Sequence, residues 1–393
     1  MEKVSQSPTE ASFVQNPYPF YAQLRQLGHF VYWEEFGLPM ATSAEAVNAV
    51  LRHPSLGRAL PGGAQRAVPD HLRPFYDIEA RSLLELEAPD HTRLRKLVLR
   101  AFTRAGVSDL VPVIQGIAEE LIGRFPSGPF DLIEAFAKPL PVRTIAHMLG
   151  VPESKSADLL AWSNAMVAMY QARRDREIEM AAANAAMEFG AYVAGLIDIR
   201  RHAPGEDLVS QLVMAEVDGN RLSDAEIIST TILLLNAGHE ATVHTIGNTV
   251  PLLIDFPARS HSLAPDRVEN TVEECLRYDP PLHMFRRWVY KDVNILGQRF
   301  CAGEEIGCLL ASACRDETVW PDAEQFDPAR RKRPNAAFGA GIHFCVGAPL
   351  ARIELQIALS TLFARCPDLR IAEPPQVANL YHFHGFERLM VRV

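Results

Sequence analysis

The sequence lacks long apolar runs, an excess of basic residues and any paired-cysteine motif. No stretch of the 393 residues comes near the roughly 20 consecutive apolar residues of a membrane-spanning helix. Residues 1–16 are polar and lack the basic start and apolar block of a signal peptide. The formal net charge is −9, whereas nucleic-acid-binding domains are usually basic. We therefore predict a cytoplasmic protein with no membrane anchor and no nucleic-acid partner.

The six cysteines are spaced in a way that excludes the common cysteine sites. They occupy positions 275, 301, 308, 314, 345 and 366, so neither a CxxC nor a CxxCH motif occurs. A disulfide framework is not expected in a reducing compartment. Five of the cysteines are expected to be ordinary buried thiols, and the residues around Cys345 set it apart.

The hydrophobic pattern predicts a mainly α-helical protein with small β-sheets. A hairpin is expected within 30–42, and strands within 289–308. Residues 53–84, rich in proline and glycine, are expected to form a long irregular connection. No linker divides the chain, so a single domain over 1–393 is predicted. Helices are expected at 43–52, 90–102, 108–125, 139–149, 153–170, 177–202, 223–255, 265–278 and 345–365.

The helix expected at 223–255 is the clearest in the sequence. It opens on Ser223, with Glu226 three residues later, which is a capping-box pattern. It is some thirty residues long and apolar on most faces, so we expect it to cross the middle of the protein.

The motif with the strongest chemical implication is FGAGIHFCVG at residues 338–347. Glycines before a cysteine let the backbone turn tightly and approach a flat ligand. A cysteine at a helix start is stabilised as a thiolate by free N–H groups and the helix dipole. Gly347 would leave room for a large planar group beside the helix. A single cysteine in a glycine-rich turn would be structural, but the whole pattern is more specific.

This pattern resembles the haem-binding signature of the cytochromes P450, and the resemblance extends over nearly the whole chain. It implies the P450 fold, with haem b (iron protoporphyrin IX) between the long central helix and the cysteine loop. It implies that Cys345 is the iron ligand. The other haem-contacting residues of the motif would be Phe338, Gly339, His343 and Gly347.

Two further motifs match the same family. Glu274 and Arg277 form its E-x-x-R motif, and Arg330 in FDPAR (326–330) matches the arginine of its meander. Glu and Arg three residues apart share a helix face, and the family uses this trio to brace the region behind the haem. His91 and Arg95 resemble its H-x-x-x-R motif. With Arg287 and His343 they would give four donors for the two haem propionates.

The central helix contains AGHEAT at residues 237–242, which resembles the stretch above the oxygen-binding face in the family. The small residues at 237 and 238 would leave room for dioxygen and substrate, and Glu240 would deliver protons. The residue after the acid is usually threonine, but here it is Ala241. Thr242 is about 100° further round the helix. A water or substrate hydroxyl could replace the threonine, Thr242 could act through a local helix distortion, or the enzyme could use peroxide.

The resemblance implies a monooxygenase that inserts one oxygen atom from O2 into a C–H bond. No flavin-binding or iron–sulfur segment is recognisable, so the expected electron donors are a separate ferredoxin and its NAD(P)H-dependent reductase. Basic residues at 93, 96, 100 and 104 and at 331–333 could steer such docking, or could form an ordinary solvated face.

The substrate is expected to be small to medium-sized and apolar. Segments 166–170 and 382–386 are candidates for closing the pocket. Two other functions stay open: atypical chemistry such as peroxygenation or oxidative coupling, motivated by Ala241, and a non-enzymatic haem sensor. The candidate pocket residues are Leu83, Leu84, Ala237, Leu282, Met284 and Phe285.

Overall fold

The computed structural model describes residues 1–63, 67–104, 106–170, 174–379, 381 and 383–393. Its internal contacts divide the chain into two compact units, each described here by itself. The predicted single domain stays a prediction. The sheet unit comprises Met1–Ala64, Ala118–Ala137 and Ala241–Val393, and the helical unit comprises Gln65–Ile117 and Lys138–Glu240.

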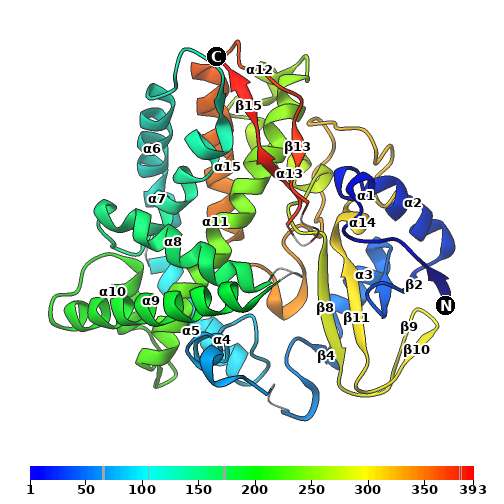
Figure 1. Cartoon of the computed structure of the whole chain (residues 1–393), viewed down its shortest axis with the longest axis horizontal. Helices are drawn as coiled ribbons and strands as arrows, with labels where there is room; N and C mark the ends of the chain where they lie inside the picture. Colours follow the sequence, from blue (N-terminus) through cyan, green and yellow to red (C-terminus); the bar gives the residue numbers. More distant parts are fainter. Residues whose placement is uncertain (64–66, 105, 171–173, 380, 382) are drawn as a thin grey trace. The chain divides into compact units, whose positions relative to one another are not determined.

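The sheet unit contains a six-stranded sheet with the order β1-β2-β3-β11-β8-β4. The predicted hairpin is confirmed, since Phe30 of β2 pairs with Ala41 of β3 in antiparallel register. Figure 1 shows the long strands β8 and β11 side by side, as their antiparallel pairing requires. The strands are β1 (Glu2–Val4), β2 (Phe30–Trp33), β3 (Leu38–Ala41), β4 (Leu56–Gly57), β8 (Met284–Val289) and β11 (Glu305–Leu309).

Successive residues of β8 contribute to two different hydrophobic cores, because side chains alternate between the faces of a strand. Met284 belongs to a core that β2 shares with the first two helices. Phe285 packs against a second core, under α3. Small sheets complete the unit: β9 (Val293–Ile295) with β10 (Gln298–Phe300), β12 (Arg370–Ile371) with β15 (Met390–Arg392) and β5 (Phe130–Asp131), and β13 (Gln376–Val377) with β14 (Phe386–Arg388).

The helix predicted at 43–52 is confirmed as α3, and the Ser43 hydroxyl caps it by accepting from the Ala46 N–H at 3.2 Å. The helix predicted at 265–278 begins slightly later. The helical segments of the sheet unit are α1 (Ala11–Gln15), α2 (Tyr18–Leu27), α3 (Ala44–Arg52), η1 (Pro61–Gly63), η4 (Ile133–Ala137), α12 (Arg259–Ser262), α13 (Val268–Tyr278), α14 (Leu310–Cys314), η7 (Gly341–His343) and α15 (Ala348–Arg365).

The helical unit confirms the predicted helices between residues 90 and 202. The prediction of an irregular connection over 53–84 was only partly right, because β4, α4 and two short 3₁₀ turns form there. The segments are η2 (Asp70–Leu72), α4 (Arg73–Glu79), α5 (Asp90–Arg104), η3 (Val107–Leu110), α7 (Pro139–Met148), η5 (Glu153–Lys155), α8 (Ser156–Val167), η6 (Ala168–Tyr170), α9 (Arg176–His202), α10 (Leu208–Met214), β6 (Glu216–Val217) and β7 (Asn220–Arg221).

One helix of this unit, α9, has the length and hydropathy of a membrane span. Its buried face includes Ala182, Ala186 and Phe189, so part of that apolar character serves packing inside the unit. A core helix of a globular protein meets the same criteria.

Two helices pass from one unit into the other, namely α6 (Val111–Gly123) and α11 (Asp224–Ile254). The predicted capping box at the start of α11 is confirmed. The Ser223 N–H donates to Glu226 Oε2 at 2.8 Å, and the Ser223 hydroxyl accepts from the Glu226 N–H at 3.3 Å. From there α11 is α-helical throughout its 31 residues.

Candidate functional site

The loop that carries Cys345 is shaped by backbone turns that favour glycine. Gly339 has φ +68° and Gly341 has φ +74°, both in the left-handed region. The loop closes on itself, because the Cys345 N–H donates to the Phe338 carbonyl at 3.1 Å. Cys345 is exposed. This conformation places a single thiol at the end of a hydrogen-bonded turn.

The structure corrects the expectation that Cys345 begins a helix. Helix α15 begins at Ala348 with Gly347 as its N-cap, so Cys345 lies two residues before the cap. The effect of a helix dipole falls off within the first turn. The sequence pattern missed this because the glycine that ends the loop is also compatible with helix geometry.

Exposure distinguishes Cys345 from most of the other cysteines. Burial raises the pKa of the Cys275 and Cys308 thiols to about 12 and that of Cys314 to about 11. Burial also raises the pKa of Cys366. Such thiols stay protonated and are poor metal ligands. The prediction of five buried thiols is wrong for Cys301, which is also exposed and lies in the turn after β10.

The two glycines at positions 339 and 347 of the Cys345 loop differ in how closely other atoms pack against them. A Cβ atom added to Gly339 would lie 3.1 Å from the ring of Phe285 on β8. By contrast, a Cβ added to Gly347 would meet only the Cys345 sulfur, at 3.9 Å, which is an ordinary contact. The protein's own atoms therefore require glycine at 339 but not at 347.

Arg352 is a residue of this region that the sequence analysis missed. Its guanidinium lies 4.6 Å from the ring centroid of Phe338. The same side chain is paired with Glu273, which is buried on α13. Arg352 thus holds the first residue of the loop in place through a cation–π contact. The sequence could have indicated this residue, because Arg352 follows the first turn of the helix after the cysteine.

The two expected propionate donors in the sheet unit are in different settings. Arg287 lies on β8 and is only 2% exposed. Its Nη1 donates to the Arg286 carbonyl at 2.8 Å. His343 is half-buried in η7, two residues before Cys345. Buried arginines are rare unless anionic or carbonyl partners surround them.

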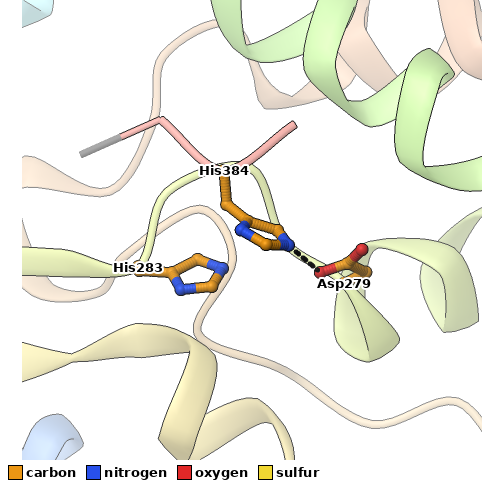
Figure 2. Close-up of side chains that lie close together, drawn as sticks. All are labelled: Asp279, His283 and His384. Atoms are coloured by element: carbon orange, nitrogen blue, oxygen red, sulfur yellow. Dashed lines mark ion pairs between the residues drawn. The ribbon is translucent and has the colours of Figure 1, made fainter. Parts of the chain in front are cut away.

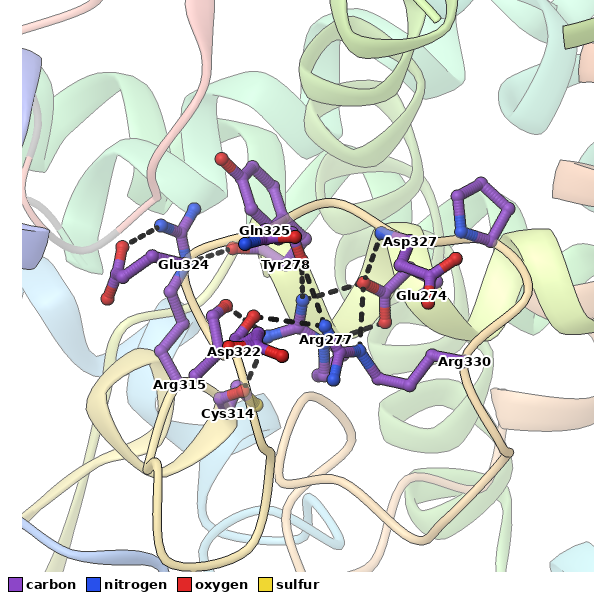
Figure 3. A network of polar contacts seen from close by, with 12 residues as sticks. Glu274, Arg277, Tyr278, Cys314, Arg315, Asp322, Glu324, Gln325, Asp327 and Arg330 are labelled. Atoms are coloured by element: carbon purple, nitrogen blue, oxygen red, sulfur yellow. Dashed lines mark hydrogen bonds and ion pairs between the residues drawn. The ribbon is translucent and has the colours of Figure 1, made fainter. Parts of the chain in front are cut away.

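Glu274 and Arg277 form a buried pair on α13, shown in Figure 3. Arg277 donates from Nε and Nη2 to the two carboxylate oxygens of Glu274, each at 2.7 Å. Arg330 Nε is 3.4 Å from the same carboxylate, and the Asp327 N–H donates to it at 2.9 Å. The remaining donors of Arg277 reach the backbone carbonyls of Cys314, Ala323 and Gln325.

The helical unit contains His91 and Arg95 on α5 and residues 237–240 on α11, and the sheet unit contains Ala241 and Thr242. His91 is buried and Arg95 half-buried on α5. On α11, Glu240 is half-buried and Ala237 exposed. His239, which the sequence analysis passed over, is 1% exposed, and its Nε2 lies 3.5 Å from Glu240 Oε1. The two side chains form a histidine–carboxylate pair in which the histidine is buried and the carboxylate is 22% exposed.

Gly238 requires a correction. It was expected to leave room for dioxygen, but a Cβ added there would lie 2.6 Å from Cδ1 of Ile145 on α7. The glycine therefore allows α7 to pack closely against α11.

Ala241 stands where the family usually has threonine, and one of the three possibilities was that a local helix distortion lets Thr242 replace it. The helix is regular α-helix through residues 237–245, so the distortion is absent from this described segment. Thr242 is buried, and the Thr245 hydroxyl donates to the Ala241 carbonyl at 2.7 Å. A water or substrate hydroxyl, or the use of peroxide, stays open.

The candidate pocket residues differ in their environment. Leu282 pairs with Phe383 in an isolated bridge and, like Phe285, is only partly buried. Met284 instead belongs to a buried core, where its sulfur would lie 3.5 Å from a Cβ added to Gly307. In the helical unit Leu83 is buried and Leu84 half-buried. Met284 is thus a packing residue. His382, in the expected closing segment, lies outside the described residues.

The chain resembles characterised proteins along nearly its full length. A family model described as cytochrome P450 matches residues 267–375. The chain is 37% identical over 377 residues to cytochrome P450 monooxygenase PikC of Streptomyces venezuelae. That alignment covers 92% of this chain and 87% of PikC. The chain is 36% identical over 376 residues to vitamin D(3) 25-hydroxylase of Pseudonocardia autotrophica (92% and 89%). Among solved structures, P450BioI in complex with an acyl carrier protein ligated to hexadec-9Z-enoic acid has a TM-score of 0.90 at 31% identity, covering 98% of this chain and 100% of that chain.

Proposed function

The chain belongs to the cytochrome P450 family of monooxygenases, and we propose that it inserts one oxygen atom from O2 into a small to medium-sized apolar substrate, with haem b bound through Cys345. The observation that carries the proposal is the exposed Cys345 thiol at the end of a glycine-bounded turn. The other exposed cysteine, Cys301, lies in the turn after β10.

The residues present fit a haem ligated by a thiolate. A side chain at position 339 would crowd the turn, because its Cβ would lie 3.1 Å from the Phe285 ring. Beside Gly347, only the sulfur of Cys345 lies within 4 Å of an added Cβ. When bound, haem supplies the iron that activates dioxygen, and a thiolate ligand favours cleavage of the O–O bond.

Side chains of the protein would hold the haem and deliver protons. Cys345 Sγ would hold the iron, and Phe338, fixed by Arg352, would keep the loop in position. Arg287 and His343 would donate to propionate oxygens. His91 and Arg95 remain further candidates on α5. Glu240 would pass protons inward, with the His239 ring 3.5 Å from its carboxylate.

The test is the absorption spectrum of the purified protein, reduced with dithionite and exposed to carbon monoxide. We expect a strongly red-shifted Soret band that Cys345→Ser abolishes. Cys301→Ser is the matched control, because it removes the other exposed thiol and should leave the band unchanged. A histidine-type band in folded wild-type protein, or an unaltered band in Cys345→Ser, would refute the assignment.

An apolar substrate is supported by the side chains around the loop. Leu282 and Phe285 are apolar and only partly buried, and Phe285 lies against the Gly339 turn. The relatives include a protein named for hydroxylating vitamin D(3) and one solved with a fatty acid on an acyl carrier protein. A screen of sterols, free fatty acids and carrier-bound acyl chains by spin-state shift would test the class. Binding of polar compounds alone would contradict it.

A ferredoxin and an NAD(P)H-dependent ferredoxin reductase are the proposed electron donors, in the cytoplasm. Arg331, Lys332 and Arg333 are exposed just before the Cys345 loop. Arg93 is a weaker candidate than the sequence suggested, because it is half-buried and paired with Glu226. Lys96 and Arg100 are exposed, and the Arg104 side chain lies outside the described structure.

Charge reversal tests this docking surface. Arg331→Glu should slow association with an acidic ferredoxin and weaken its salt dependence. Arg370→Glu, on the exposed side of β12, is the control. Equal effects of the two variants would argue against docking near the loop.

Ala241 favours one alternative, an enzyme of the same family that uses peroxide directly. Product formation with peroxide alone should then match or exceed that with O2 and redox partners. Ala241→Thr should shift the balance toward the O2 route. Product that depends entirely on reduced partner proteins would exclude this alternative.

A further inference from the structure

Three polar side chains from two segments meet in the sheet unit, away from the Cys345 loop in sequence. They are Asp279 after α13, His283 before β8 and His384 near the C-terminus, drawn in Figure 2. One potential ligand atom from each lies within 4.8 Å of the others. His384 Nε2 is 3.5 Å from Asp279 Oδ1, and the two imidazole rings are 4.5 Å apart between centroids. The group was not apparent from the sequence, because Pro280 and Pro281 separate Asp279 from His283 and His384 follows 101 positions after His283.

Hydrogen bonds fix which nitrogen of His283 faces the group. Its Nδ1 lies 2.9 Å from the Tyr21 hydroxyl. That hydroxyl donates its single proton to Tyr381 Oη at 2.9 Å, so it must accept from His283 Nδ1–H. The lone pair of the neutral ring is then on Nε2.

His283 Nε2 is buried and has no hydrogen-bond partner in the protein. The residue is 1% exposed, and Figure 2 shows this side of the ring pointing toward His384 and Asp279. An unsatisfied buried acceptor is costly and calls for a ligand.

The outer contacts resemble those that orient metal ligands. Tyr21 holds His283, and the Tyr18 hydroxyl donates to Asp279 Oδ1 at 2.5 Å. Metal-binding histidines usually have their second ring nitrogen fixed in this way. Arg315 is the neighbouring cation, and its Nη1 donates to Glu324 at 2.8 Å, which offsets its charge.

An open pocket of about 510 Å³ gives solvent access to the group. Asp279 and His384 line it together with Tyr18, Tyr278 and Arg315. An ion could therefore enter from solution, and a water molecule could complete its coordination.

We propose that Asp279, His283 and His384 bind a divalent transition-metal ion, with zinc as the best fit. Two imidazoles and one carboxylate form a common zinc ligand set, and hard ions such as Ca²⁺ or Mg²⁺ prefer oxygen alone. Ligand atoms about 2.1 Å from one zinc lie about 3.4 Å apart in a tetrahedron, close to the 3.5 Å between His384 and Asp279. The His283 ring would move inward on binding. The metal would tie the C-terminal segment to the end of α13, independently of the haem.

Calorimetric titration of the chelator-treated holoprotein with zinc chloride tests the site. We expect one equivalent to bind and to raise the thermal midpoint. Asp279→Asn and His283→Phe should abolish this binding, and Tyr21→Phe should weaken it about 10- to 100-fold. The control is His202→Gln, since His202 is an exposed histidine bonded to its own helix backbone. It should leave binding unchanged.

The reduced carbon monoxide spectrum of each variant reports whether it is folded. Should the substitutions prevent folding, zinc-edge X-ray absorption of the wild type decides the question. Imidazole scattering with nitrogen and oxygen ligands supports the site, and sulfur ligands overturn it. Absence of a stoichiometric site, or the same affinity in Asp279→Asn as in His202→Gln, also overturns it.

Discussion

Arg277 donates two hydrogen bonds of 2.7 Å to the two carboxylate oxygens of Glu274, and its other donors end on three backbone carbonyls. All five N–H groups of the guanidinium are thereby used. Both side chains are at most 3% exposed. The pair fixes the loop after α14 to α13, so it organises backbone that leads toward the Cys345 loop.

Glu274→Gln should destabilise the protein by about 3–5 kcal/mol, because it leaves the Arg277 charge buried without its counter-ion. Urea unfolding followed by far-UV circular dichroism measures the change. Glu373→Gln is the matched control, since Glu373 pairs with Arg388 at the surface, where both side chains are at least half exposed. That substitution should cost no more than about 1 kcal/mol. Similar losses in the two variants would contradict the structural role.

Gly238→Ala should destabilise the protein by about 1–3 kcal/mol, the usual cost of overpacking. The cause would be the clash of the new Cβ with Ile145 Cδ1, 2.6 Å away. Ile145→Val removes that methyl group, so the double variant should be more stable than the sum of the single changes predicts. The thermal midpoints of the four proteins measure this coupling. Additive effects would show that Gly238 is needed for another reason.

The sequence predicted the architecture well where local signals agree with tertiary packing. Ser223 and Glu226 mark the start of α11, and Ser43 marks that of α3. The helix start assigned to Cys345 was wrong, because Gly347 can serve either as a loop residue or as an N-cap. Boundaries depend on such contacts, which neighbouring residues alone do not encode.

The candidate site was predictable only as far as its motifs extend. Glu274 and Arg277 are neighbours on one helix face, so their pairing follows from spacing. Gly238 was misinterpreted because its neighbour Ile145 is 93 positions away in the sequence. His283 and His384 are likewise brought together only by the fold. No periodicity connects such residues.

Gly339→Ala should weaken haem binding more than Gly303→Ala does. Both positions have positive φ, so both substitutions carry a backbone cost of about 1–2 kcal/mol. Only at 339 would the new Cβ also press on Phe285, at 3.1 Å, whereas nothing lies within 4 Å at 303. The ratio of Soret to protein absorbance in matched preparations measures haem occupancy. Equal occupancy in the two variants would mean that close approach at Gly339 is unimportant.

Protein stability should fall as pH rises above about 9, partly because of the buried thiols. Burial raises the pKa of Cys275 from 9.0 to about 12 in the folded protein. The unfolded chain therefore loses this proton first. The stabilising effect is complete below pH 9 and is lost progressively as the pH approaches 12. Removing the thiol in Cys275→Ala should make the decline between pH 9 and 11 shallower by up to about 1.4 kcal/mol per pH unit.

Urea unfolding of wild type and variant at half-unit pH steps measures the two slopes. Cys301→Ala is the appropriate control, because it removes an exposed thiol in place of a buried one. Comparing slopes rather than midpoints also cancels the loss of packing that any change at Cys275 brings. Equal slopes in the three proteins would mean that the Cys275 thiol ionises with similar ease in the folded and unfolded states, against the burial seen for it.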